Sequence, residues 1–148
     1  METKGIKEIF RDAKGLLNQS IRICGWVKTI RDQKTFGFIE LNDGTYFKNL
    51  QVVIEESLPN FSRVIKLSVG SALVIEGNLV ESPGSKQPFE LKATRVMIEG
   101  ESTPDFPLQK KRHSFEYLRT IAHLRPRTNT FAAVFRVRSL AAYAIHQF

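Results

Sequence analysis

Aromatic and basic side chains stand close together within residues 21–51, and their combination suits the binding of nucleic acid. Phe36 and Phe38 are two residues apart, so they share one face if this stretch is a β-strand. Three basic residues precede them in the sequence: Lys28, Arg31 and Lys34. An aromatic ring can stack on an unpaired base while a cation attracts phosphate, so this stretch is a candidate surface for single-stranded nucleic acid.

Each candidate side chain also has a structural explanation. Phe38 either stacks on a base or belongs to the core. Gln51, a polar residue inside the apolar run LQVVI, either hydrogen-bonds a base edge or occupies a solvated edge position. Arg31 and Lys34 either contact RNA or lie in a solvated loop. Glu81 is either an ordinary surface acid or an acceptor for the amino group of a base. The residues alone leave these alternatives open.

The spacing of apolar residues predicts five strands with one helix between the third and the fourth. Ile21, Ile23 and Val27 alternate with polar residues, which is typical of a half-buried strand. The expected strands are 21–28, 36–41, 50–54, 72–80 and 89–98, with helices at 6–17 and 59–67. This order predicts a mainly β fold, the five-stranded Greek-key barrel called the OB-fold, whose loops Thr29–Gln33 and Glu81–Pro88 flank a binding face on strands 2 and 3.

The region after the barrel carries the positive charge of the chain. Residues 106–148 hold eight basic residues against one acid, Glu116, whereas residues 1–105 hold 14 of each, so the net charge of +7 belongs to the C-terminal region. We expect an OB-fold domain at 1–104, a basic linker at 105–127 and one helix at 128–148, which Thr128 or Asn129 can cap. Arg125-Pro126-Arg127 is either an RNA-facing patch or a structural tether.

The composition argues against several other classes of protein. The three histidines are far apart and have no cysteine partner, so we expect no metal site. No phosphate loop, nucleophile elbow or carboxylate pair is present, so we expect no catalytic residues. A single cysteine, Cys24, and the lack of a long apolar run or a signal sequence favour a cytoplasmic protein with no membrane partner.

Four segments resemble the asparaginyl-tRNA synthetase family of class II: GWVKTIRDQKTFGFIEL, VESPGSKQPFEL, KRHSFEYLRTIAHLRPRT and FRVRSLAAYAIHQF. The resemblance extends from about Ile21 to Phe148, and SPGSKQPFEL favours the asparaginyl over the aspartyl enzyme. It implies an anticodon-binding OB-fold. In that family Phe38 would stack on the central anticodon uridine and Gln51 would hydrogen-bond it. Glu81 would lie near a neighbouring base, and Arg31 and Lys28 would meet the backbone of the anticodon loop.

The last helix resembles the first class II signature motif, which forms the homodimer interface in that family. The interface residues implied are Phe131, Val134, Phe135, Arg138 and Ile145. The motifs that bind ATP and the aminoacyl-adenylate are absent, so we expect a piece that is truncated inside the dimer helix, is inactive by itself and needs no cofactor. The full enzyme would join asparagine to tRNA(Asn) with ATP and Mg²⁺. Two alternatives remain, a stand-alone single-strand-binding module and an aspartate–tRNA ligase.

Overall fold

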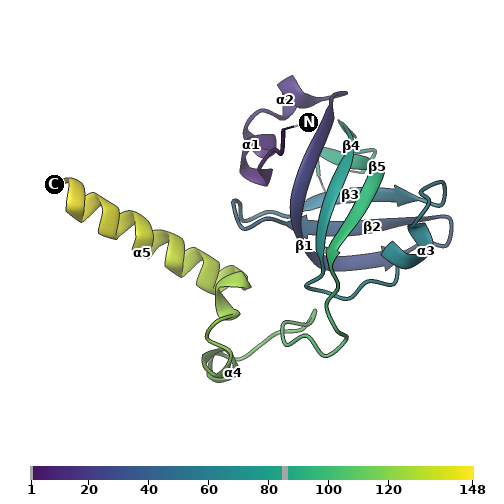
Figure 1. The fold of residues 1–148 in the computed structure, drawn as a ribbon. Helices are drawn as coiled ribbons and strands as arrows, with labels where there is room; N and C mark the ends of the chain where they lie inside the picture. Colours follow the sequence, from purple (N-terminus) through teal and green to yellow (C-terminus); the bar gives the residue numbers. More distant parts are fainter. Residues whose placement is uncertain (1, 85–86) are drawn as a thin grey trace. The chain divides into compact units, whose positions relative to one another are not determined.

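Five strands close into a barrel in this computed structural model, which describes residues 2–84 and 87–148 (Figure 1). Around the barrel the order is β1, β2, β3, β5, β4, and β3 pairs with β5 in parallel while all other pairs are antiparallel. The strands are β1 (Ser20–Asp32), β2 (Phe36–Asn42), β3 (Leu50–Glu55), β4 (Ala72–Glu81) and β5 (Phe89–Gly100). The predicted OB-fold is confirmed.

Alternate residues of every strand fill the inside of the barrel. Ile23, Ile39, Ile54, Ile75 and Leu91, one from each strand, have no exposed surface. Each buried aliphatic side chain contributes about 1.5–3 kcal/mol relative to an exposed one. Their neighbours in sequence necessarily point outward, so the same alternation that builds the core also selects the residues of the outer surface.

Three register shifts interrupt the pairing of the strands. The pairing of β1 with β2 skips Lys28, and the pairing of β4 with β5 skips Glu99 and, between Ala93 and Arg95, Thr94. The inward residues of β5 therefore change from odd positions, such as Leu91, to even positions, such as Val96. The imperfect alternation of apolar residues in 89–98 was the sequence signal of this bulge.

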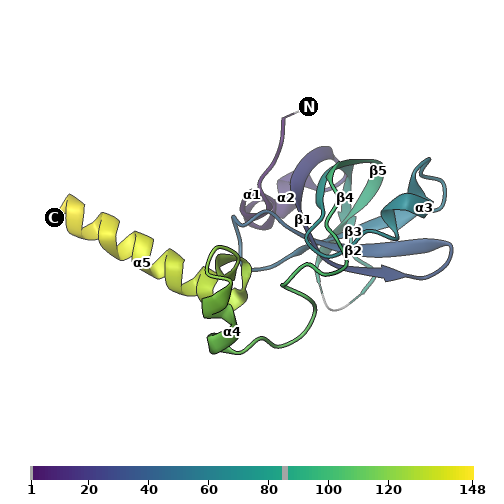
Figure 2. The ribbon, with the colours of Figure 1, turned by 60° about the horizontal axis from the view of Figure 1, so that its bottom comes forward.

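Two short helices replace the single helix predicted for residues 6–17. They are α1 (Ile6–Arg11) and α2 (Ala13–Leu16), and the backbone leaves helical geometry at Asp12. The β2–β3 loop caps the start of α1, because Ile6 N–H donates to Asp43 Oδ2 at 2.7 Å. Ile6 is fully buried in the hydrophobic core together with barrel residues, and this packing holds α1 against the barrel (Figure 2).

The helix predicted at 59–67 is also shorter, since α3 covers only Phe61–Val64. Its continuation tightens into i→i+3 bonds, with Lys66 N–H on Arg63 O and Leu67 N–H on Val64 O. Ile65 packs against Gly37 of β2 so closely that any Cβ at Gly37 would collide with Ile65 Cδ1. A side chain at Gly37, between Phe36 and Phe38, would therefore force Ile65 to move.

Both predicted binding loops differ from expectation at one end. The first loop was predicted at Thr29–Gln33 with a few residues allowed on either side, but it begins later, because β1 continues to Asp32. The connection to β2 is a tight turn with Lys34 at φ +71°. Glu81 was placed in the second loop, but it is the last residue of β4 and pairs with Phe89. Ser85 and Lys86 of that loop lie outside the described residues. Longer strands extend the ordered surface on which side chains can be positioned.

The chain divides into two compact units, residues 1–106 and 107–148. The segment after β5 is held to the first unit, because Ser102 N–H donates to Ser71 Oγ at 3.0 Å. The ring of Phe106 covers Gly70, where a Cβ would lie only 3.0 Å from the ring carbons. Gly70 has φ +92°, so a side chain there would be strained as well as crowded.

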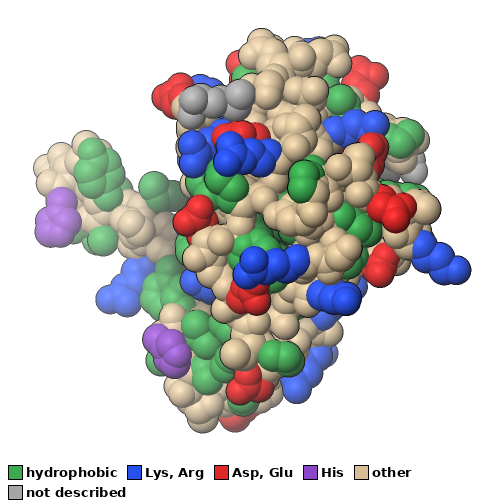
Figure 3. Space-filling view, turned by 45° about the vertical axis from the view of Figure 1, so that its right-hand side comes forward, with side chains coloured by type: hydrophobic (Ala, Val, Ile, Leu, Met, Phe, Trp, Pro, Cys, Tyr) green, Lys and Arg blue, Asp and Glu red, His purple; other side chains and the backbone are tan. Residues whose placement is uncertain are grey.

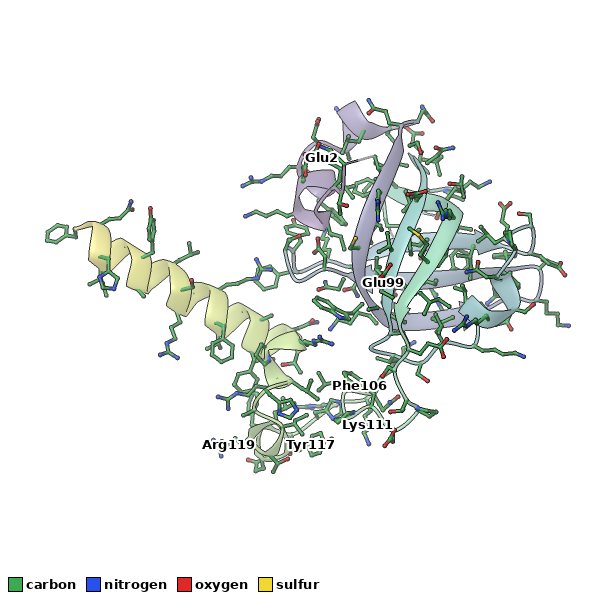
Figure 4. The ribbon with its side chains drawn as sticks, in the orientation of Figure 1. Glu2, Glu99, Phe106, Lys111, Tyr117 and Arg119 are labelled. Atoms are coloured by element: carbon green, nitrogen blue, oxygen red, sulfur yellow. The ribbon has the colours of Figure 1, made fainter. Side chains whose placement is uncertain are left out.

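The second unit contains structure that the prediction of a basic linker did not include. It comprises α4 (Phe115–Thr120), a 3₁₀ turn (Arg125–Arg127) and α5 (Asn129–Gln147). Tyr117, labelled in Figure 4, stacks on His113 and donates from its hydroxyl to Pro107 O. None of the helices in the described parts of the chain is long and apolar enough to cross a membrane.

Arg125 connects the turn to α5. Its guanidinium carbon lies 4.8 Å from the ring centre of Phe131 and 5.9 Å from that of Phe135. This contact favours a structural tether over an RNA-facing patch for Arg125. Thr128 is the N-cap residue of α5, but its hydroxyl donates to Arg125 O instead of accepting a bond from the helix.

Candidate nucleic-acid interface

Phe38 lies on the outer surface of the barrel and not in the core. Its neighbours Gly37 and Ile39 face inward, whereas the Phe38 side chain is half-buried on the outside. The ring of Phe36 meets it edge-on with the ring centres 5.4 Å apart. This contact holds Phe38 from one side and leaves an aromatic platform on β2.

A groove of about 720 Å³ runs beside this platform. It is lined by β2, β3, the start of β5 and the chain just after β4. Its lining includes Phe36, Phe38, Gln51, Val53, Ser82 and Glu90. A groove of this size with an aromatic wall and a few polar groups can accept one or more nucleobases.

Gln51 stands in the groove with its amide already oriented. Its Oε1 accepts a hydrogen bond from Arg31 at 3.3 Å, and its Nε2 donates to Glu90 Oε2 at 3.1 Å. Ser82 Oγ donates to the same oxygen of Glu90 at 3.2 Å. Because an amide has two N–H donors and two lone pairs, Gln51 keeps one N–H and one lone pair for a ligand. Uracil offers the complementary pair of an acceptor carbonyl and an imino N–H.

Glu90 is the residue of this site that the sequence analysis missed. Only 6% of its surface is exposed, although it points outward between the inward residues Phe89 and Leu91. Three elements converge on it, since β5 carries it, β3 supplies Gln51 and the chain after β4 supplies Ser82. The available signal was its parity in β5, which places it on the same face as Gln51.

The charges around the groove separate base binding from phosphate binding. Its described lining contains three acids, Glu55, Glu56 and Glu90, and no lysine or arginine. Basic and acidic side chains are mixed on the face shown in Figure 3, without a single large basic patch. Carboxylates repel phosphate but accept hydrogen bonds from base N–H groups. The groove is therefore suited to base edges, with the phosphates held outside it.

The predicted site residues fall into two groups. Phe38, Gln51 and Arg31 come together, with the Arg31 guanidinium 5.3 Å from the Phe38 ring centre. Glu81 is exposed and is not among the described residues that line the groove. Lys28 is the bulged residue of β1 and likewise does not line it.

The closed five-stranded barrel and its base-sized outer groove define an oligonucleotide-binding protein of the OB class. Residues 21–99 match the tRNA anticodon family, described as an OB-fold nucleic acid binding domain, and the chain belongs to that family.

Known proteins extend the similarity beyond the barrel. The chain is 68% identical to an asparagine–tRNA ligase of Acetivibrio thermocellus over all of its own length, but it spans only 32% of that relative. It superposes with a TM-score of 0.85 and 21% identity on asparaginyl-tRNA synthetase from Pyrococcus horikoshii, covering 99% of this chain and 34% of that one. A protein from Leishmania major described as an aspartyl-tRNA synthetase gives 0.83 at 18% identity, covering 99% and 31%. The resemblance to asparaginyl-tRNA synthetases is confirmed.

Proposed function

We propose that this chain is the anticodon-recognition part of an asparagine–tRNA ligase and that it binds tRNA(Asn) through its anticodon loop. The observation that carries the proposal is that Phe38 and Gln51 line one groove while Arg31 contacts both of them. The central uridine stacks on Phe38, and the free N–H and lone pair of Gln51 bind its Watson–Crick edge. Arg31 meets the loop backbone, and Lys28 lies further along the same strand.

The acidic residue of the proposed site is Glu90 and not Glu81. Glu90 fixes the orientation of Gln51 and adds a carboxylate to the floor of the groove. A carboxylate rejects the acceptor edges of bases and favours their donor edges. Glu90 therefore contributes to the choice of base both directly and through the amide that it orients.

The catalytic activity of the whole protein is proposed from the relatives. A ligase of this kind consumes ATP and asparagine, with Mg²⁺ as its metal. Within residues 2–84 and 87–148, no group of three or more His, Cys, Asp and Glu side chains is placed to hold a metal ion. The contribution proposed for the residues of this chain is to bind the tRNA. The proposed compartment is the cytoplasm.

The interface of a homodimer is proposed on α5. Val134, Arg138 and Ile145 project from one side of this helix at 100° per residue, and all three are exposed. Phe131 and Phe135 lie closer to the turn and contact Arg125. An exposed apolar stripe of this kind is stabilised when a second copy covers it.

The test is binding of the purified chain to the anticodon stem-loop of tRNA(Asn) and to the same RNA with cytidine at the central position. We expect the uridine loop to bind at least tenfold more tightly, because cytidine reverses the donor and acceptor that Gln51 reads. Equal affinity for both loops would instead favour a stand-alone single-strand-binding module. Aminoacylation by the full-length protein with each amino acid separates asparagine from aspartate, which the shared fold cannot do.

A further inference from the structure

A second hollow continues from the groove along the outer surface of the barrel. Its volume is about 360 Å³, and it shares Val53, Glu55 and Ser57 with the groove. Its far side is formed by Asn78 of β4 and Lys92 of β5. Because three lining residues belong to both spaces, a strand of RNA that leaves the groove in this direction enters the hollow directly.

One register row connects the two spaces. Phe38 pairs with Val53, Val53 pairs with Lys92, and Lys92 pairs with Asn78. Paired residues in neighbouring strands point to the same side of a sheet. Neighbouring strands are about 4.8 Å apart, so Phe38 and Lys92 stand roughly 10 Å apart across the surface. That separation places different nucleotides of one strand at the two positions.

The lining of the hollow has the mixed chemistry that a nucleotide needs. Val53 and Leu58 form the apolar floor of the hollow, and a base can cover the small part of them that is exposed, 7% and 6%. Asn78 offers an amide with both donors and an acceptor, and Lys92 offers a positive charge. The described lining of the groove contains no basic residue. Along the row from Phe38 through Val53 to Asn78, the positive charge is therefore that of Lys92.

Lys92 can bind a phosphate because the ion pair that it must give up is weak. Its Nζ lies 3.2 Å from Glu55 Oε1, and both side chains are about half exposed, at 55% and 52%. An ion pair this exposed is weak because water screens it. A phosphate can therefore replace Glu55 as the partner of Lys92, and the released carboxylate can accept a hydrogen bond from a base.

We propose that the hollow around Lys92 is a second nucleotide subsite, which holds a nucleotide that flanks the bases read in the groove. The phosphate of this nucleotide pairs with Lys92, its base covers Val53 and Leu58, and Asn78 contacts its edge. The proposal rests on the proposed function, because it needs the same RNA strand to lie across Phe38.

The experiment measures binding of the full chain to the anticodon stem-loop at several salt concentrations. Lys92→Met should raise Kd about three- to tenfold at low salt and lower the slope of log K against log salt by roughly 0.7, the value for one phosphate contact. Lys14→Met, on the exposed surface of α2, is the matched control and should change neither quantity.

A second arm removes the base of each loop nucleotide that flanks the anticodon, one position at a time. One of these abasic loops should bind the unmodified chain several-fold more weakly, and that loss should shrink in Asn78→Ala. If Lys92→Met behaves like Lys14→Met and no flanking base matters, while Phe38→Ala still weakens binding, the subsite is refuted and the proposed function stands. If Phe38→Ala has no effect either, both proposals fail.

Discussion

Arg31 and Phe38 are direct register partners across β1 and β2, and the guanidinium of Arg31 lies 5.3 Å from the centre of the Phe38 ring. The same guanidinium donates to Gln51 on β3. One side chain therefore contacts both the aromatic platform and the amide, and it restrains both before any RNA arrives. Sites restrained in this way lose less conformational entropy on binding.

Replacing the aromatic platform should weaken RNA binding without unfolding the barrel. We expect Phe38→Ala to cost about 1–3 kcal/mol in affinity for the anticodon stem-loop, the contribution of one stacked base. Phe38→Tyr should retain most of the affinity because its ring has the same face. Phe47→Ala, an exposed aromatic of the β2–β3 loop, is the control. Circular dichroism checks the fold. If the Phe38→Ala variant were unfolded, Phe38 would be a residue that stabilises the barrel and not a binding residue.

Removing the charge of Glu90 should change which base is preferred more than how tightly RNA binds. In Glu90→Gln the new amide can turn its own N–H toward Gln51 and reverse the orientation of that amide. We expect the preference for uridine over cytidine to fall by about 1–3 kcal/mol, measured with matched stem-loops. Glu81→Gln is the control at the exposed end of β4, and a larger effect there than at position 90 would reverse the assignment.

Two glycines of the barrel should tolerate alanine very differently. A Cβ at Gly77 would collide with the backbone oxygen of Lys92, whereas a Cβ at Gly37 would collide with the end of the Ile65 side chain. A side chain can move more easily than a paired strand, so Gly77→Ala should be the more destabilising change in urea unfolding. We expect Gly37→Ala to cost about 1–3 kcal/mol. Adding Ile65→Val removes the colliding Cδ1 and should recover part of that loss.

The dimer proposal predicts that changes on one side of α5 alter the oligomeric state. Val134→Asp and Ile145→Asp should each shift the chain toward monomers, because they place a charge where an apolar contact is expected. Ser139→Asp, on a different side of the same helix, should have little effect. Sedimentation over a range of protein concentrations distinguishes the outcomes. A chain that stays monomeric at all concentrations before any substitution would remove the basis of the proposal.

The basic residues of the second unit should act on tRNA outside the anticodon loop. Lys110, Lys111 and Arg112 follow one another in a region with few acids. Changing all three to Gln should weaken binding of whole tRNA and reduce its salt dependence, while binding of the isolated stem-loop should stay the same. Equal losses with both RNAs would show instead that these residues attract any RNA without a defined position.

The barrel could be predicted because its pattern is local. Strand alternation and the helix between β3 and β4 are visible in short windows of sequence, and so is the shared face of Phe36 and Phe38. The position of Glu90 could not be predicted in the same way. Its burial depends on the register between β3 and β5, which are far apart in sequence, and on Ser82 reaching back over it. The family resemblance pointed to Glu81, which the structure places at the exposed end of β4 and outside the described lining of the groove.

The helices show the opposite error, in which local pattern was given too much weight. Residues 6–17 have helical spacing throughout, but the helix breaks at Asp12, a residue that favours turns and caps. The start of α1 is decided by Asp43, a residue of the β2–β3 loop, which no local window contains. At the start of α1 a contact distant in sequence determines the local structure, whereas the break at Asp12 agrees with the preference of that residue for turns.

The attachment of residues 101–106 to the barrel shortens the tether between the two units. The backbone N–H of Ser102 is hydrogen-bonded to Ser71, and the Phe106 ring covers Gly70. These two contacts hold residues 102–106 against the barrel. A shorter free tether confines its two ends to a smaller volume and raises the effective concentration of each at the other. For the RNA binding proposed above, the basic residues that begin at Lys110 therefore follow closely in the chain after a segment that is fixed on the barrel.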